Sequence, residues 1–295
     1  MKVSICMPVY NNASELPMTL KSVFSQTCTD WELIAVDDGS TDGSLEILQS
    51  IKDTRVRVYS DGKNRGGAFR RNQATNIAQG EFIALMDADD LWHPKKIELQ
   101  LDWFAGNPGG TVLCTWSWSM LDDEIVGVRR VSAKDLQPQS ILRRNVIAQP
   151  SIMARAQILK SNSYVEVWTR SEDHELWIRL SKQYKIDVLP RPLLIINERH
   201  AHSLNNALRT FSVERHIYLL HAPLLCGWPT TVALILKSLV KSLVRCAVTP
   251  FNVSSFLVRR RVNSRSPDEH ALAQQVLSEI QSAAVPGISR RIDPK

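Results

Sequence analysis

Three carboxylates follow a continuous apolar run in residues 80–90, GEFIALMDADD. The apolar residues 82–86 have the pattern of a strand that is covered on both faces. Asp87 and Asp89 follow at a spacing of two, so we expect both side chains to leave the sheet on the same side, at its carboxyl edge, where open α/β sheets bind ligands. Such carboxylates repel each other unless a hard cation, Mg²⁺ or Mn²⁺, lies between them and a phosphate. An acidic turn in which Asp89 or Asp90 caps the next helix would have the same sequence.

Aromatic and polar residues at the ends of two earlier strands could hold a nucleotide. Pro8, Tyr10 and Asn11 could stack on a planar base and bond to its edge, although an ordinary strand exit has the same composition. Asp38, in the segment DDGSTDG of residues 37–43, could accept hydrogen bonds from a base or a ribose. A capped turn explains this segment equally well, because Ser, Thr and Asp readily begin helices.

A glycine-rich turn with arginines, NRGG at residues 64–67, is followed by Arg70 and Arg71. Because a helix N-terminus binds anions, such a segment could lie near phosphate or near the nucleotide base. Further along, SEDHELWIR begins a helix near residue 171. The helix dipole stabilises acids in the first turn by roughly 0.3–1 kcal/mol, which would explain them without a function. If Asp173 faces the same cleft as Asp89, it is a candidate general base.

Strands alternate with helices along the first 120 residues. The apolar patterns predict strands over 2–9, 31–36, 55–59, 82–86 and 112–118, and helices over 14–25, 45–51, 68–79 and from Pro94. The pattern indicates an α/β fold, a Rossmann-like, mostly parallel sheet with helices on both faces and a site along its carboxyl edge. Residues 121–149 give no firm element.

Composition describes a globular protein, with 44% hydrophobic and 22% charged residues among 295. The five cysteines, an odd number without C-x-x-C spacing, argue against a disulfide framework and a zinc site and suit a reducing compartment. The first apolar stretch is too short for a signal peptide and is broken by Pro8. We therefore expect a cytoplasmic protein.

The basic charge is concentrated in the last third of the chain. Residues 1–204 hold 24 Lys and Arg against 25 Asp and Glu, whereas residues 205–295 hold 12 against 5. We therefore divide the chain into a catalytic domain over 1–205 and a basic, mostly helical C-terminal extension over 206–295.

Within this extension, Lys237, Lys241 and Arg245 recur every four positions along an apolar stretch over 228–250. A cationic amphipathic helix indicates attachment to a membrane surface, here the inner face of the cell membrane, and the cluster Arg259–Arg261 could attract anionic lipid. A helix docked on the protein with a solvated basic face fits equally well. Residues 217–236 lack charge and are long enough to span a bilayer, but their prolines, glycine and histidine argue against it.

Five segments in this order resemble the family 2 glycosyltransferases, which have the A-type glycosyltransferase fold. They are PVYNN at 8–12, VDDGSTDGS at 36–44, NRGGAFRRNQA at 64–74, GEFIALMDADD at 80–90 and SEDHELWIRL at 171–180. The resemblance covers residues 1–205, and the tail after about residue 210 lies outside it. It implies a nucleotide-sugar donor, UDP- or TDP-linked, and a divalent metal ion, Mg²⁺ or Mn²⁺.

The resemblance also implies a role for each matching position. The contacts to the nucleotide sugar would be Pro8, Tyr10, Asp38, Asn64, Arg71 and Asp87. Asp89 would hold the metal ion on the diphosphate, with Asp87 nearby and His200 as a late ligand. The match around His200 is poorer, because Asn197-Glu198 replaces the usual aromatic residue and arginine, and His202 is the alternative.

The resemblance implies an inverting mechanism in which Asp173 takes the proton from an acceptor hydroxyl while the metal ion stabilises the departing nucleoside diphosphate. We expect a glycan or a lipid-linked acceptor, in cell-surface polysaccharide biosynthesis, and no nucleic-acid partner. A nucleotidyltransferase that makes a nucleotide sugar would share the sheet and the carboxylates. It would normally have a glycine-rich, basic loop where this chain has Tyr10-Asn11-Asn12. A non-catalytic nucleotide-sugar-binding subunit is the other alternative, against which the intact Asp89 and Asp173 argue.

Overall fold

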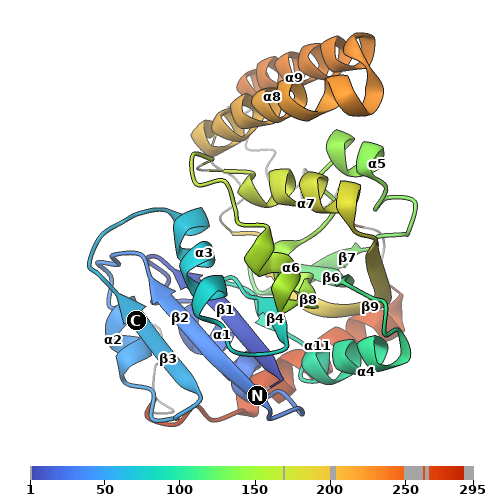
Figure 1. The fold of residues 1–295 in the computed structure, drawn as a ribbon. Coiled ribbons are helices and arrows are strands. Elements are labelled where there is room, and N and C mark those ends of the chain that lie inside the picture. The colour runs from blue at the N-terminus through green and yellow to red at the C-terminus, as the bar shows by residue number, and fades with distance from the viewer. Residues whose placement is uncertain (1, 169, 200–203, 249–261, 263–265, 289–295) are drawn as a thin grey trace.

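The computed structural model describes residues 2–168, 170–199, 204–248, 262 and 266–288 (Figure 1). The strands are β1 (Val3–Val9), β2 (Trp31–Asp37), β3 (Val56–Ser60), β4 (Phe82–Leu85), β5 (Leu91–Trp92), β6 (Val112–Leu121), β7 (Glu124–Arg129), β8 (Met153–Arg155) and β9 (Ile186–Asn197). The helices are α1 (Leu16–Phe24), α2 (Ser44–Gln49), α3 (Gly67–Ile77), α4 (Lys96–Gly106), α5 (Pro138–Arg143), α6 (Ala156–Ser161), α7 (Glu172–Gln183), α8 (Leu204–Cys226), α9 (Trp228–Val248) and α11 (Pro267–Ser282), with a 3₁₀ turn, η1 (Gln149–Ser151).

The described strands form one sheet in the order β3-β2-β1-β4-β8-β6-β9-β5, with β7 paired to β6. The strands β1 to β4 pair in parallel, as their alternation with helices predicted, so their carboxyl ends meet at one edge. Beyond β4, the strand β8 runs antiparallel to both β4 and β6, and β9 runs parallel to β6. The parallel half expected from the sequence is therefore continued by a mixed half.

Helices cover both faces of the sheet because successive strand residues point to opposite faces. Ile5 and Met7 of β1 pack on one face, in a core with α1 and α4. Cys6, between them, packs on the other face, in a core with α3 and α7. The predicted covering of both faces is thus confirmed, and it explains why β4 is a continuous apolar run and why β1 and β2 are mostly apolar.

The longest strand, β9, was missed in the sequence. It contains Pro190 and Pro192, which normally argue against a central strand because proline cannot donate to the ladder. Its pairing with β6 shifts register around Trp116, and the prolines lie at this irregularity. The last part of β9 pairs with β5, which directly follows the acidic segment 87–90; we call these four residues the acidic turn.

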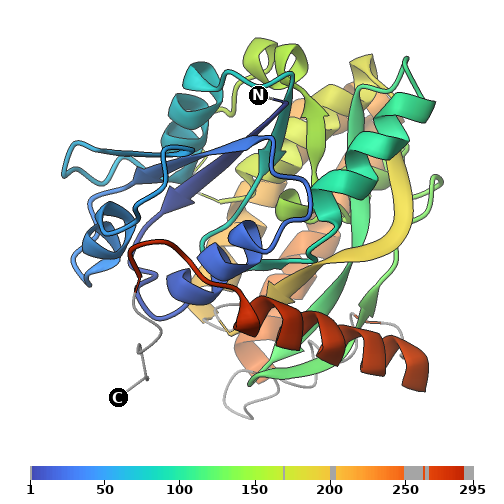
Figure 2. The ribbon, with the colours of Figure 1, turned by 90° about the horizontal axis from the view of Figure 1, so that it is seen from below.

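The described residues after 205 lie in two places. Helices α8 and α9 form a hairpin that turns at Gly227, with a φ of 79°, and it lies over α5 and α7 (Figure 1). Helix α11 lies on the far side of the molecule along α1 (Figure 2). There Val276 and Ile280 pack against Trp118 in a third apolar core. Among the described helices, none combines the length and apolarity needed to cross a bilayer.

Candidate active site

The acidic segment after β4 forms a turn instead of continuing the strand. The backbone N–H of Asp90 donates to the carbonyl of Asp87 at 3.3 Å. Because the turn breaks the two-residue period, Asp87 and Asp89 do not face the same cavity. Asp87 and Asp90 line a cavity of about 340 Å³, which we call the first cavity. Asp89 lines a second cavity, of about 670 Å³, between α1, α11 and the ends of β6 and β9. The expectation that both carboxylates leave the sheet on one side is therefore wrong.

Neither Asp89 nor Asp90 caps the next helix, α4. Asp90 is followed by β5, and α4 begins only at Lys96, without a side-chain cap. The carboxylate of Asp90 instead accepts the backbone N–H of Asn197 at 2.9 Å, which fixes the end of β9 against the turn. Burial, and then the nearby carboxylates of Asp89 and Asp87, raise the pKa of Asp90 well above its usual value.

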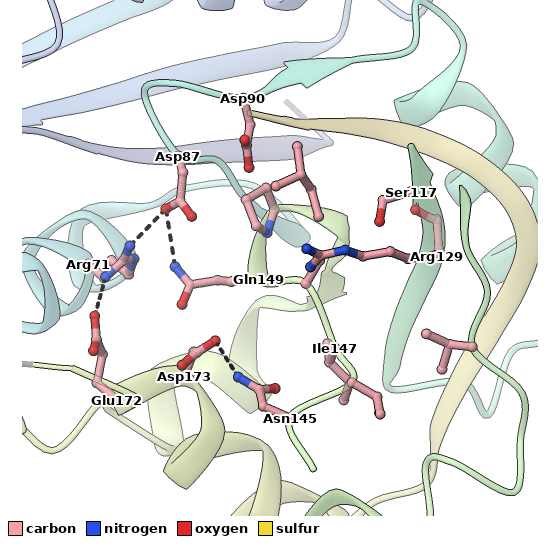
Figure 3. Close-up of a pocket in the computed structure, with 16 residues that line it drawn as sticks. Arg71, Asp87, Asp90, Ser117, Arg129, Asn145, Ile147, Gln149, Glu172 and Asp173 are labelled. Carbon is pink, nitrogen blue, oxygen red and sulfur yellow. Dashed lines mark hydrogen bonds and ion pairs between the residues drawn. The ribbon is translucent and has the colours of Figure 1, made fainter. Parts of the chain in front are cut away.

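The first cavity gathers residues from segments that are far apart in the sequence (Figure 3). They are Arg71 of α3, Asp87 after β4, Asn145 from the connection between α5 and η1, Gln149 at the start of η1, and Glu172 and Asp173 in the first turn of α7. Arg71, Asp87 and Asp173, which the sequence assigned to one site, are thus brought together. Asp89 is not among the residues that line this cavity.

Arg71 bridges two carboxylates across the first cavity. Its Nη2 lies 2.8 Å from Oδ1 of Asp87, and its Nη1 lies 2.8 Å from Oε1 of Glu172. The side-chain amide of Gln149 contacts this bridge. Although burial opposes it, the two carboxylates raise the pKa of Arg71, so the guanidinium keeps its charge. Gly67 leaves room for the bridge, because a Cβ atom there would lie 2.9 Å from Nη1 of Arg71.

Asp173 is held by uncharged hydrogen-bond donors. Nδ2 of Asn145 donates to its Oδ2 at 2.9 Å, and the backbone N–H of His174 donates to its Oδ1 at 2.7 Å. Burial raises the pKa of Asp173 above its usual value, and these hydrogen bonds offset only part of that effect. A carboxylate whose pKa is raised towards neutral pH, and which opens onto a cavity, has the properties of a general base.

The acidic turn has the chemistry of a site for a hard divalent cation. Three carboxylates lie within four residues here, and burial together with the charges of Asp89 and Asp87 raises the pKa of Asp90. Mg²⁺ and Mn²⁺ prefer such oxygen ligands and usually complete their coordination with water and substrate phosphates. Among the described residues, no three His, Cys, Asp or Glu side chains form a closed metal site. Carboxylate oxygens of this kind suit an ion whose other ligands are water and phosphate oxygens. His200 and the alternative His202 lie outside the described residues.

The loops expected to hold the nucleotide lie at the carboxyl ends of β1, β2 and β3. We call the loops that follow β1, β2 and β3 the first, second and third loops. The side chain of Asn11 in the first loop accepts from the backbone N–H of Thr41 in the second at 2.8 Å, which joins these two loops. Asp38, only 3% exposed, accepts from the backbone N–H groups of Arg65 and Gly66 at 2.7 and 3.0 Å. Its carboxylate therefore fixes the third loop.

The remaining expected nucleotide contacts are accessible. Tyr10 and Asn64 have exposed side chains, and Pro8 is partly exposed near the end of β1. Gly39 permits the close approach of the second and third loops, since a Cβ atom there would lie 2.9 Å from the carbonyl carbon of Lys63. The lining of the first cavity does not include Pro8, Tyr10, Asp38 or Asn64.

Reading the sequence missed Asn145, Gln149 and Glu172 as site residues, together with Ser117 and Arg129, which also line the first cavity. Asn145 and Gln149 fall in the stretch without a periodic pattern. Their only sequence signal is that they flank the three apolar residues Val146-Ile147-Ala148. Arg129 forms an ion pair with the buried Glu198, one of the residues that replace the usual pair before His200.

Comparison with known proteins identifies the family. The model of glycosyl transferase family 2 matches residues 4–155. The chain is 28% identical to an Escherichia coli enzyme named UDP-Glc:alpha-D-GlcNAc-diphosphoundecaprenol beta-1,3-glucosyltransferase WfgD, over 63% of this chain and 72% of that protein.

Solved structures show the same fold. S. aureus TarS 1–349 in complex with UDP-GlcNAc aligns with a TM-score of 0.61 and 19% identity, over 97% of this chain and 82% of that chain. A mannosyltransferase from Pyrobaculum calidifontis in complex with GDP-Man and Mn²⁺ aligns with a TM-score of 0.58 and 15% identity, over 95% and 84%. A longer TarS chain is matched over only 39% of its length.

The family match covers β1 to β4, the acidic turn and the connection that carries Asn145 and Gln149. It sets aside the nucleotidyltransferase and the non-catalytic subunit as alternatives. The chain belongs to glycosyl transferase family 2 and is a glycosyltransferase with the A-type fold.

Proposed function

We propose that this glycosyltransferase is metal-dependent and inverting, and that it transfers a sugar from a UDP- or TDP-linked donor to a hydroxyl of a glycan or lipid-linked acceptor. The UDP-GlcNAc complex of TarS supports a nucleotide-sugar donor. The E. coli relative is named for a diphosphoundecaprenol acceptor, which supports a lipid-linked one. A Bacillus subtilis relative, 29% identical over 74% of this chain, is named for teichuronic acid biosynthesis, which supports a role in polysaccharide synthesis.

Asp173 is the proposed general base. Its raised pKa and its place in the first cavity suit it to take the proton of an acceptor hydroxyl as that oxygen attacks the anomeric carbon. Asn145 orients the carboxylate and stabilises its charged form. Attack from the side opposite the leaving group inverts the configuration and needs no covalent enzyme intermediate.

Arg71 is the proposed contact to the donor within the first cavity. Its guanidinium, now bridging Asp87 and Glu172, can offer the same N–H groups to the hydroxyl or phosphate oxygens of a donor. We assign Pro8, Tyr10, Asp38 and Asn64 to the nucleoside. The three loops that carry them are joined to one another, so a nucleoside would meet one fixed surface.

Asp89 and Asp87, with His200, are the residues that would hold a divalent ion. Such an ion would supply a Lewis acid that neutralises charge on the departing diphosphate. The Mn²⁺ complex of the P. calidifontis mannosyltransferase supports the use of a metal ion in this fold. Asp87 lines the first cavity and Asp89 lines the second, so the two proposed ligands come from one turn that lies between these cavities.

The observation that carries the proposal is the meeting of Asp87, Arg71 and Asp173 around one cavity. Purified protein should be incubated with a panel of nucleotide sugars and Mn²⁺ or Mg²⁺, with release of nucleoside diphosphate as the first readout. The anomeric configuration of the transferred sugar, read by proton NMR, then tests inversion. Retention of configuration, or release of inorganic diphosphate, would contradict the proposal.

We further propose that transfer takes place in the cytoplasm, at the inner face of the cell membrane, and that residues 1–205 form the transferase domain with 206–295 as its extension.

A further inference from the structure

The α8–α9 hairpin turns an apolar face outwards. Large apolar side chains that recur at helical spacing on α9 are exposed: Val232, Leu236, Leu239, Val240, Leu243 and Val244. At the hairpin turn, Leu224 and Trp228 are 87% and 63% exposed. Few exposed large apolar side chains lie elsewhere in the described chain. A contiguous apolar face of this kind on a protein surface indicates an interaction site.

The opposite face of α9 packs against α8 and combines apolar side chains, such as Leu234, with polar ones. Arg215 of α8 donates from Nη1 to Oγ of Ser242 at 3.2 Å, and Lys241 lies 4.0 Å from Glu214. Ser238 is buried in the same interface and donates to the carbonyl of Phe211. The sequence left open a docked helix with a solvated basic face. The helix does dock on α8, but of its three basic residues only Lys237 is exposed, whereas Lys241 and Arg245 are half-buried.

Charge identifies what covers this face. Between residues 205 and 265 the chain has nine Lys and Arg residues and one acidic residue, Glu214. Glu214 is mostly buried, beside Lys241. Lys237 is exposed and, by the helical period, stands at the margin of the apolar stripe. An apolar face with Lys237 at its margin and a tryptophan at its end, in a segment of strong positive charge, matches the boundary between anionic headgroups and acyl chains.

We infer that the α8–α9 hairpin lies on an anionic bilayer surface, with the apolar face of α9 in the headgroup–acyl boundary. It lies on the bilayer and does not span it, since neither described helix can cross a membrane. The role of this contact in catalysis rests on the proposed function, because a lipid-linked acceptor would be presented at the bilayer surface.

The hairpin is attached to the helix that carries Asp173. Nε2 of His221 on α8 lies 3.2 Å from Oε1 of Glu175 on α7, and Nζ of Lys182 lies 3.0 Å from Nδ1 of His221. Ile217 and Tyr218 of α8 pack in the same core as Leu176 and Ile178 of α7. Docking of the hairpin would therefore orient α7, and the first cavity with it, relative to the bilayer.

The test is co-sedimentation of the full chain with vesicles of phosphatidylcholine alone and with about one third phosphatidylglycerol. We expect binding to the anionic vesicles, weakened by salt. Leu236→Glu/Leu243→Glu should lower the partition coefficient at least tenfold. The matched control is Val167→Glu/Leu272→Glu, which places the same charges on exposed apolar residues outside the hairpin and should change it less than twofold. Circular dichroism and thermal melting check that both variants fold.

Three results would overturn the inference: equal binding to neutral vesicles, no binding to either kind, or equal loss in the control variant. If light scattering shows a dimer that only the hairpin variant dissociates, and vesicles do not bind, a second copy covers the face instead. Donor-dependent thermal shift should be the same in both variants, since none of these residues lines the first cavity. Failure of sugar transfer would contradict the proposed function and leave the vesicle result standing.

Discussion

Nδ2 of Asn145 lies 2.9 Å from Oδ2 of Asp173 and donates a hydrogen bond to it. The donor is uncharged, so it orients the carboxylate without neutralising it. Because a hydrogen bond to the charged form favours that form, Asn145 limits the rise in the pKa of Asp173 that burial causes. The balance leaves Asp173 able both to accept a proton and to be ionised when the acceptor arrives.

Replacing Asn145 should shift the pH profile of transfer. Asn145→Ala removes a donor to the carboxylate, which should raise the pKa of Asp173 further. Since the base must be deprotonated, the acidic limb of kcat/KM should move to higher pH. At neutral pH we expect a loss of about tenfold or more, in line with ~1.5–3 kcal/mol for a hydrogen bond to a charged group. The control is Asn107→Ala, which removes an exposed side-chain amide that donates to the backbone carbonyl of Trp103. An unchanged acidic limb would show that Asn145 does not act on the base.

The Arg71 bridge requires a guanidinium. Lysine has one compact charge and cannot bond to Asp87 and Glu172 at once with fixed geometry. Arg71→Lys should therefore lower kcat/KM for the donor about 10–100-fold, chiefly through a higher KM, corresponding to roughly 1.4–2.7 kcal/mol. Arg130→Lys, at a partly exposed pair with Glu269, should have little effect. Wild-type kinetics in Arg71→Lys would mean that the bridge does not serve the donor.

Removal of the metal ion should have the same effect as removal of Asp89. We expect EDTA to abolish transfer by the wild-type protein and Mn²⁺ to restore it, because the departing diphosphate needs a counter-charge. Asp89→Ala should lose transfer and should no longer show a Mn²⁺-dependent thermal shift in the presence of donor. Asp102→Ala, an exposed carboxylate on α4, is the control. Activity of Asp89→Ala equal to that of the wild type would refute the metal role of Asp89.

Lys96 should make stability depend on pH above neutrality. It is fully buried, with Nζ 2.7 Å from Oε1 of Gln100 and 4.1 Å from the ring centre of Trp92. Burial lowers the pKa of Lys96 well below its usual value, so the unfolded chain binds this proton more readily than the folded one. Stability should therefore increase as pH rises from the lowered pKa towards about 10.4.

Lys96→Met isolates this contribution. Its Tm, relative to that of the wild type, should fall as the buffer is moved from pH 7 to pH 9.5, because only the wild type gains stability from loss of the Lys96 proton. A Tm difference that stays constant over this range would show that Lys96 keeps its proton in the folded protein.

The sequence was sufficient to predict the parallel strands, because their apolar residues follow the pattern expected of a buried strand. The apolar runs of β1, β2 and β4 placed Asp38 and Asp87 at one edge of a parallel sheet, and the structure confirms that edge. The prediction failed at Asp89 because a turn, and not a strand, follows Leu85. It failed for β9 because prolines at a register shift look like a loop. Asn145 was out of reach, since only tertiary packing brings its irregular segment to α7. The amphipathic pattern of α9 was read correctly, but which face turns outwards depends on the polar groups of α8.

The most direct test of the account is sugar transfer by Asp173→Asn, which keeps the shape of the side chain and removes its ability to take a proton. Transfer should fall by about 10²–10⁴, the usual contribution of a general base, while the donor affinity measured by calorimetry stays within a factor of two. Asp102→Asn, an exposed carboxylate away from the first cavity, should keep full activity. Transfer by Asp173→Asn at the wild-type rate would contradict the assignment of Asp173 as the base.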